Sequence, residues 1–221
     1  MEKTNKLILK TFILTILFTL SCLVLSGCGI NAKLILRVYN ETNSSNSYGY
    51  EQTCIINFYG NNFTTKSSYL KINGNLTELK VVENTLNDFD EDEPISTTET
   101  HIYYDGTFKY TKQGTSYIKT TGTVEFNNDN KANFKENYLE NVKLINLKEE
   151  NKTLLKAKIK DENIKDVLNE ENLSNAEFSI LYNNKTKKVE QVELTYLSQN
   201  NNLVTIKTNY FIEAQSIILP M

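Results

Sequence analysis

Side chains that could do chemistry are few in this chain of 221 residues, which holds one histidine and three cysteines. His101 could act as a general base or as a metal ligand. No cysteine, second histidine or serine-containing elbow lies near it in the sequence, and a strand histidine beside tyrosines is more often structural. We therefore expect no catalytic role, no metal site and no cofactor at His101.

An acidic run is the second candidate for chemistry. Calcium outside the cell is bound by several carboxylate and carbonyl oxygens. The run lacks the spaced Asp, Asn and Gly pattern of a calcium loop, so we favour a solvated loop of mutually repelling charges and keep calcium binding as the alternative. Its members are Asp88, Asp90, Glu91, Asp92 and Glu93.

Common catalytic motifs are missing from the sequence. It has no Gly-rich phosphate loop, no Gly-x-Ser-x-Gly elbow and no His-Glu-x-x-His, which argues against common hydrolases and NTPases. The formal net charge is −3 and Arg37 is the single arginine. Nucleic-acid binding depends on clustered cations, so we expect neither an enzyme nor a nucleic-acid-binding protein.

The N-terminus has the layout of an export signal. Three lysines lie within the first ten residues, and an apolar run from Thr11 to Val24 follows. This order predicts a signal peptide over residues 1–27. An uncleaved transmembrane helix is the alternative, because the run is near the lower limit of about 18 residues for spanning a bilayer. Both interpretations place the remaining chain outside the cytoplasm, since the lysines stay inside.

The end of the apolar run, Leu25-Ser26-Gly27-Cys28, resembles the lipobox of bacterial lipoproteins. The resemblance implies that the signal peptidase recognises Leu25, Ser26 and Gly27. It also implies that the Cys28 thiol takes a diacylglyceryl group and that Cys28 becomes the first residue of the mature protein. Two acyl chains hold a protein stably at a bilayer, because each buried methylene contributes ~0.8 kcal/mol. We therefore expect a lipid anchor on the extracytoplasmic face of the cell membrane.

Two expectations concern the start of the mature chain. Residues 28–50 include the polar stretch from Asn40 to Ser47, so we interpret them as a lipidated N-terminus and a tether without an amphipathic helix. A single domain then covers residues 51–221. Within it Cys54 has no disulfide partner once the signal peptide has left, and we expect a buried, inert thiol on a strand.

Alternating apolar residues dominate the chain from Glu51 onward. Cys54, Ile56 and Phe58 share one face of a strand, and similar alternation recurs near 70–81, 155–159, 178–182, 192–196 and 204–212. A short amphipathic helix is expected from Asp161, as its N-cap, to Leu173, and a weaker helix over 132–141. The fold class is therefore α+β and mostly antiparallel β, a curved sheet or half-barrel with one or two short helices.

Aromatic residues cluster around a predicted hairpin. Asp105-Gly106 favours a two-residue type I′ turn, which would place Tyr103 opposite Phe108, and a second turn at Gln113-Gly114 would follow. The resulting stripe could line a lipid or carbohydrate site, or could be plain core. Its candidate ligand-lining residues are Tyr103, Phe108, Tyr110 and Tyr117, and His101 shares their face.

The string from Tyr103 to Tyr117, and the ending in which the helix of 161–173 precedes three strands and Ile217-Ile218-Leu219-Pro220, resemble LolA/LprG-like lipoproteins. That resemblance covers roughly residues 97–220. It implies a half-barrel closed by helices that holds an acyl chain or glycolipid without catalysis. The alternative is a structural or interaction lipoprotein with a solid core, which meets another envelope protein through an exposed strand edge.

Overall fold

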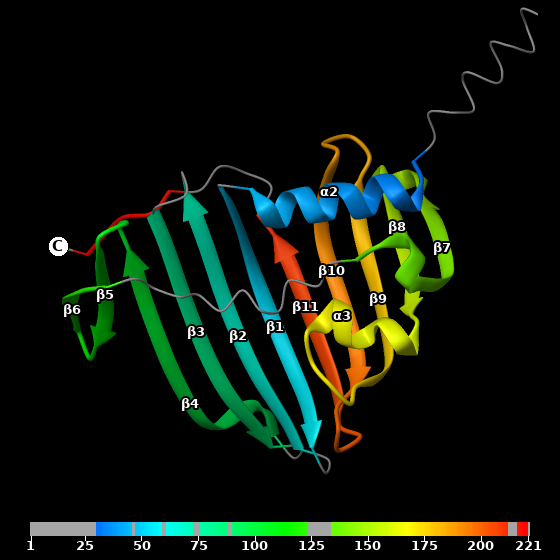
Figure 1. The fold of residues 1–221 in the computed structure, drawn as a ribbon. Coiled ribbons are helices and arrows are strands. Elements are labelled where there is room, and N and C mark those ends of the chain that lie inside the picture. Colours follow the sequence, from blue (N-terminus) through cyan, green and yellow to red (C-terminus); the bar gives the residue numbers. More distant parts are fainter. Residues whose placement is uncertain are drawn as a thin grey trace, which may run out of the picture. The chain divides into compact units, whose positions relative to one another are not determined.

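Eleven antiparallel strands form one open sheet in the computed structural model, counted over the residues that it describes. Those residues are 30–45, 47–58, 61–72, 76–87, 90–122, 134–211 and 216–220. The sheet and its helices belong to the unit from Ala32 to Met221 (Figure 1). The predicted signal peptide and Cys28 lie outside the described residues. Among the helices described, none is both long and apolar enough to cross a bilayer.

Two meanders of consecutive strands meet at the middle of this sheet. The first holds β1 (Tyr48–Phe58), β2 (Asn61–Ile72), β3 (Leu76–Asn87), β4 (Asp90–Tyr104), β5 (Phe108–Gln113) and β6 (Ser116–Thr121). The second holds β7 (Leu139–Leu147), β8 (Lys152–Ile159), β9 (Ser174–Asn183), β10 (Lys188–Leu197) and β11 (Leu203–Tyr210). Because β1 pairs with β11, the order across the sheet is β6-β5-β4-β3-β2-β1-β11-β10-β9-β8-β7. The predicted antiparallel α+β fold is confirmed.

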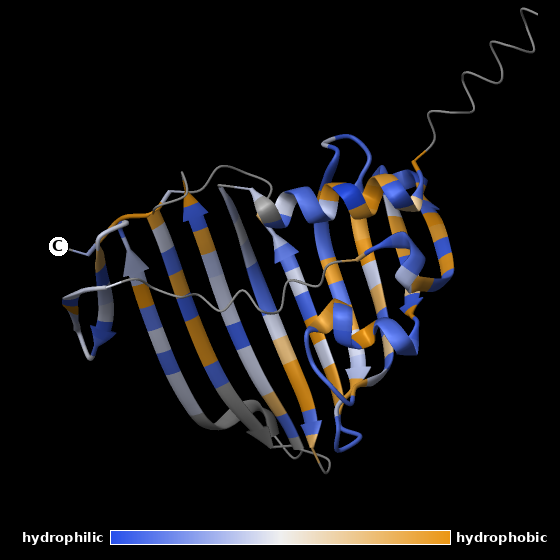
Figure 2. Ribbon diagram, in the orientation of Figure 1, coloured by the Kyte–Doolittle hydropathy of each residue, from blue (hydrophilic) through white to orange (hydrophobic). Residues whose placement is uncertain are grey.

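The alternation of the strands gives the sheet two different faces (Figure 2). One face carries Tyr50, Cys54 and Ile56 of β1 together with Phe178 of β9 and Leu194 of β10, as the strand registers show. The helices pack on this side (Figure 1), and we call it the helix-bearing face. The opposite side, with charged residues such as Glu193, is called the polar face.

Helix α2 (Ala32–Ser44) is a part of the folded core that the sequence interpretation missed. Ile35, Leu36 and Tyr39 are buried, and their spacing puts them on one stripe of the helix. The amide of Asn40 donates a hydrogen bond to the carbonyl oxygen of Phe134 at 3.2 Å. The expected tether over residues 28–50 is therefore wrong for residues 32–44, because a short apolar stripe anchors a segment that otherwise reads as polar.

The other predicted helices are shorter than expected. A 3-10 turn, η3 (Asp161–Asn163), leads into α3 (Ile164–Leu168), so Asp161 is not an N-cap. Ile164 and Val167 are buried, as predicted, and Asn169 ends the helix in the left-handed conformation with φ 55°. Residues 136–138 form only the 3-10 turn η1 (Glu136–Tyr138) before β7 begins, so the weaker helix prediction is wrong there. A further turn, η2 (Lys148–Glu150), links β7 to β8.

The first aromatic hairpin has a register two residues away from the predicted one. Tyr103 pairs with Tyr110 instead of Phe108. The turn is centred on Gly106 and Thr107, because an Asp105 carboxylate oxygen accepts the backbone N–H groups of Thr107 at 2.8 Å and Phe108 at 2.7 Å. A shift of two residues keeps each side chain on its face, so the predicted aromatic stripe survives the error.

Substituting Ile35 by alanine tests whether α2 is core or tether. We expect Ile35→Ala to lower the free energy of unfolding by about 2–5 kcal/mol, because it leaves a cavity under the helix. The measurement is urea unfolding followed by circular dichroism. Lys33→Ala, at an exposed position of the same helix, is the control and should stay within about 0.5 kcal/mol of the parent. Equal stability of the two variants would contradict the packing of α2.

Candidate functional site

One end of the sheet is filled by its helices. The ring of Phe134 stacks on Phe178 of β9 with centroids 4.0 Å apart, and Tyr39 of α2 packs against Phe134 at 5.3 Å. Beneath them Leu155 and Ile180 are fully buried. Among the described residues this part of the helix-bearing face, over β8 to β10, is packed core.

A tyrosine cluster forms the border of that core. The ring centroids of Tyr50 and Tyr69 are 5.4 Å apart, those of Tyr50 and Tyr210 are 6.2 Å apart, and Tyr39 meets Tyr210 edge-on at 6.4 Å. The Tyr210 hydroxyl donates to the Asn43 side-chain oxygen at 2.9 Å. Burial raises the pKa of Tyr39 and of Tyr50 to about 12, so both rings stay neutral at physiological pH.

Beyond the tyrosine cluster the helix-bearing face becomes open, and it carries apolar residues interspersed with polar ones such as Ser67 and Glu83. Ile56, Phe58 and Phe63 are between 38% and 41% exposed, and the Phe58 and Phe63 rings lie 6.4 Å apart. These three residues have partly exposed apolar neighbours that the registers place on the same face. We call the whole set the open apolar surface. The neighbours are Leu79, Val81 and Ile102.

Cys54 lies on the helix-bearing face, two residues before Ile56. It is a free, partly buried thiol. Burial raises its pKa, and the charge of Glu170 adds to the effect. Tyr196 lies in the same electrostatic neighbourhood, and burial raises its pKa to about 12. The expected inert strand thiol is therefore supported, because a protonated thiol is a poor nucleophile.

The four predicted ligand-lining residues lie on the polar face. Tyr103, Phe108, Tyr110 and Tyr117 come together there, as the sequence predicts, but the registers put them opposite to Tyr50 and Ile56. They therefore cannot touch a ligand on the open apolar surface. The residues that do form that surface were visible in the sequence only as strand alternation around the β1–β2 turn.

Two of these four side chains are already engaged by charged neighbours. The Lys119 ammonium sits over the Phe108 ring, 3.8 Å from its centroid. The Tyr110 hydroxyl donates to an Asp105 carboxylate oxygen at 3.0 Å. These contacts are cross-strand packing on a solvated face of the sheet. Tyr103 and Tyr117, the other two residues of the stripe, have different partners.

His101 is one of those partners. Its Nε2 lies 2.8 Å from a Glu78 carboxylate oxygen, and its Nδ1 lies 2.9 Å from the Tyr117 hydroxyl. The sequence did not pair His101 with Glu78, which stands 23 positions earlier. Burial raises the pKa of Tyr103, and the nearby Glu78 charge adds to it. In the described part of the chain no three His, Cys, Asp or Glu residues gather as metal ligands do.

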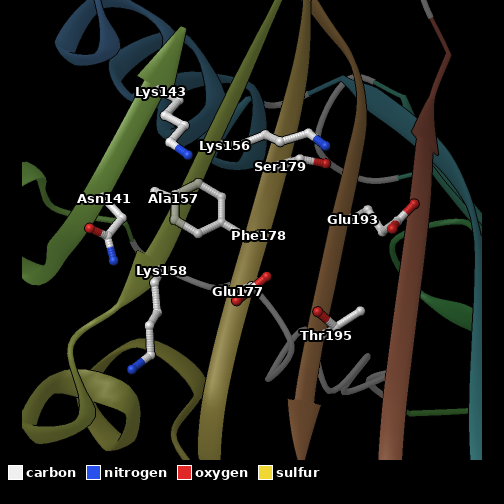
Figure 3. Close-up of a pocket in the computed structure, with 10 residues that line it drawn as sticks. All are labelled: Asn141, Lys143, Lys156, Ala157, Lys158, Glu177, Phe178, Ser179, Glu193 and Thr195. Atoms are coloured by element: carbon white, nitrogen blue, oxygen red, sulfur yellow. The ribbon is translucent and has the colours of Figure 1, made fainter.

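A depression of about 390 Å³ also lies on the polar face (Figure 3). Lys143, Lys156 and Lys158 line it together with Glu177 and Glu193. Charges of both signs face the same space, so the depression favours neither an anion nor an apolar ligand. Asp90 to Glu93 belong to strand β4, so the expected loop is wrong for these residues. The side chains of the acidic run lie outside the described residues, and the calcium alternative is untested.

Buried tyrosines should make the fold sensitive to alkali. Since burial raises the pKa of Tyr50 from 10.0 to about 12, the unfolded chain loses this proton first and stability falls as pH rises through that window. Urea unfolding at steps from pH 9 to pH 12 measures the decline. Tyr50→Phe should show a shallower decline than the parent, and Tyr104→Phe, whose exposed hydroxyl only bonds to Gly106, should match the parent. Identical slopes for all three proteins would contradict the burial of Tyr50.

Comparison with known proteins gives only structures of low similarity. No family model and no curated protein matches the sequence. Similar solved structures include LprF from Mycobacterium bovis, with TM-score 0.46 and 10% identity over 87% of this chain and 99% of that one. An outer membrane lipoprotein-sorting protein domain from Vibrio parahaemolyticus has TM-score 0.24 and 10% identity, covering 81% and 91%. A DUF1329 family protein from Desulfovibrio piger has TM-score 0.25 and 12% identity, covering 83% and 92%.

Proposed function

We propose that this chain is an extracytoplasmic lipoprotein that binds an apolar ligand, a lipid or lipidated molecule, without catalysis. The observation that carries the proposal is the open apolar surface. Ile56, Phe58 and Phe63 keep 38–41% of their surface exposed on the face that is packed core over β8 to β10. Apolar side chains exposed together in this way can mark a binding site.

The chemistry of the open apolar surface suits passive binding. Each ligand methylene removed from water contributes ~0.8 kcal/mol, so an acyl chain of about ten methylenes supplies roughly 8 kcal/mol before the entropy costs of association. Cys54 is the sole described thiol, and its raised pKa keeps it protonated. Neither a covalent step nor a cofactor is needed for such a site.

The open apolar surface can be tested with a pair of adjacent residues. The chain starting at residue 29 is purified without its anchor, and co-purifying lipid is weighed by native mass spectrometry. Ile56→Asp should lower the bound lipid several-fold, because it puts a charge on the surface. Ile55→Asp is the control, because Ile55 is 37% exposed but lies on the polar face of the same strand. Absence of lipid from the parent, or equal loss in both variants, would overturn the proposal.

The lipid anchor on Cys28 is proposed from the sequence and has its own test. Cells expressing the parent chain should incorporate radiolabelled palmitate into it, because the thiol takes the acyl-bearing group. Cys28→Ser should give an unlabelled precursor that still carries residues 1–27, and Cys54→Ser should label like the parent. Labelling of the Cys28→Ser protein would show that the anchor is elsewhere, and an unlabelled parent chain would show that there is none.

A second candidate function is favoured by the edge strand β7. Its residues Val142, Leu144 and Ile145 are 41–42% exposed, and β7 ends the sheet on the side opposite β6. An edge strand with apolar side chains can pair with a strand of another protein. A parent protein that carries no lipid would favour this structural or interaction role in the envelope over ligand binding.

A further inference from the structure

The polar face holds a cluster that neither the proposed ligand nor the proposed anchor uses. Glu78 comes from β3, His101 and Tyr103 from β4, and Tyr117 from β6. The registers place Glu78 directly opposite Tyr103 and put all four side chains on one face. We call these four residues the Tyr-His cluster.

His101 joins the polar groups of the Tyr-His cluster. Its Nε2 lies 2.8 Å from Glu78 Oε1 and its Nδ1 lies 2.9 Å from the Tyr117 hydroxyl. The Tyr103 ring packs on the His101 ring with centroids 4.6 Å apart, and on the Tyr117 ring at 5.6 Å. The side chains of His101 and Glu78 are 13% and 28% exposed, so the cluster is largely dry but can be reached from solvent.

The hydrogen bonds fix the tautomer of His101. An ionised carboxylate only accepts hydrogen bonds, so in the neutral imidazole Nε2 carries the proton toward Glu78 and Nδ1 turns its lone pair toward Tyr117. Histidines that bind metals are held in this way, with the second ring N–H donated to a carboxylate. The imidazole is thus already oriented as a ligand, with the Tyr117 hydroxyl beside its second nitrogen.

Spacing in the Tyr-His cluster also fits coordination. Two ligand atoms that each lie ~2.1 Å from a metal ion, at a right angle, are ~3.0 Å apart. The 2.9 Å between His101 Nδ1 and the Tyr117 oxygen is close to that separation. The imidazole nitrogen and this phenolic oxygen are therefore close enough to share one ion.

We propose that His101 Nδ1 and the phenolic oxygens of Tyr103 and Tyr117 bind ferric iron, with Glu78 holding the imidazole. Two phenolates and the adjacent carboxylate carry three negative charges, which balance Fe³⁺. Imidazole suits iron among the transition metals, and tyrosinate is an iron ligand in haem proteins. Binding releases two phenolic protons to water and changes no oxidation state. Calcium is a poorer fit, because it takes six to eight oxygen ligands.

This site is independent of the proposed lipid function. It lies on the opposite face of the sheet, and none of its residues belongs to the open apolar surface. Failure of one proposal therefore leaves the other standing.

The experiment titrates the full-length protein, solubilised in detergent, with ferric nitrilotriacetate. The parent should develop a visible tyrosinate-to-iron charge-transfer band that saturates at one equivalent. Tyr103→Phe and Tyr117→Phe should each lose half of the band or more. The Glu78→Gln variant should bind iron about 10–100-fold more weakly, because it lacks the carboxylate that orients the His101 imidazole.

Tyr110→Phe is the matched control. Tyr110 lies on the same face and its hydroxyl bonds to a carboxylate, that of Asp105, but it is outside the Tyr-His cluster, so its band should equal the parent's. Circular dichroism checks folding, and His101→Gln, expected to weaken binding at least tenfold, serves if a Phe variant unfolds. A parent without a band, a band that grows without saturation, or equal loss in Tyr110→Phe would overturn the site.

Discussion

The pairing of β1 with β11 is the constraint on which the rest of this fold depends. It joins the two meanders into one sheet, with Tyr50 opposite Tyr210 and Ile56 opposite Val204. These strands lie about 150 residues apart in the chain, so their pairing closes a long loop. The conformational entropy lost in closing it must be offset by burial of apolar surface. The tyrosine cluster and α2, which meet at Tyr210, supply that burial at the seam.

Dimensions explain why the helix-bearing face stays partly open. A helix of 13 residues such as α2 is about 20 Å long at 1.5 Å per residue. Eleven strands spaced ~4.8 Å apart extend over roughly 48 Å. One helix therefore covers about four strands, and α2 lies over the second meander (Figure 1). No described helix lies above the apolar residues that the first meander carries on the same face.

Sequence patterns predicted what is local and periodic. Period-two alternation located the strands, and the aromatic hairpin kept its faces although the turn at Asp105 was assigned two residues away. The patterns could not say which face of the sheet the stripe of Tyr103 and Tyr117 would occupy, because that depends on long-range pairing. They also missed α2, because asparagines such as Asn40 and Asn43 are typical of loops. In the folded protein these two side chains hydrogen-bond to Phe134 and Tyr210, which the sequence pattern does not show.

Exposure of an apolar side chain does not by itself mark a binding site on such a sheet. The neighbours of the side chain determine whether it belongs to a larger apolar surface. Ile55 and Ile56 are 37% and 38% exposed, so a list of exposed apolar residues treats them alike. Ile55 stands between Thr64 and Thr205, whereas Ile56 stands between Phe63 and Val204. The first is a single apolar residue among polar ones, which is normal for a surface. The second continues a row of apolar residues that runs into the core at the buried Val204.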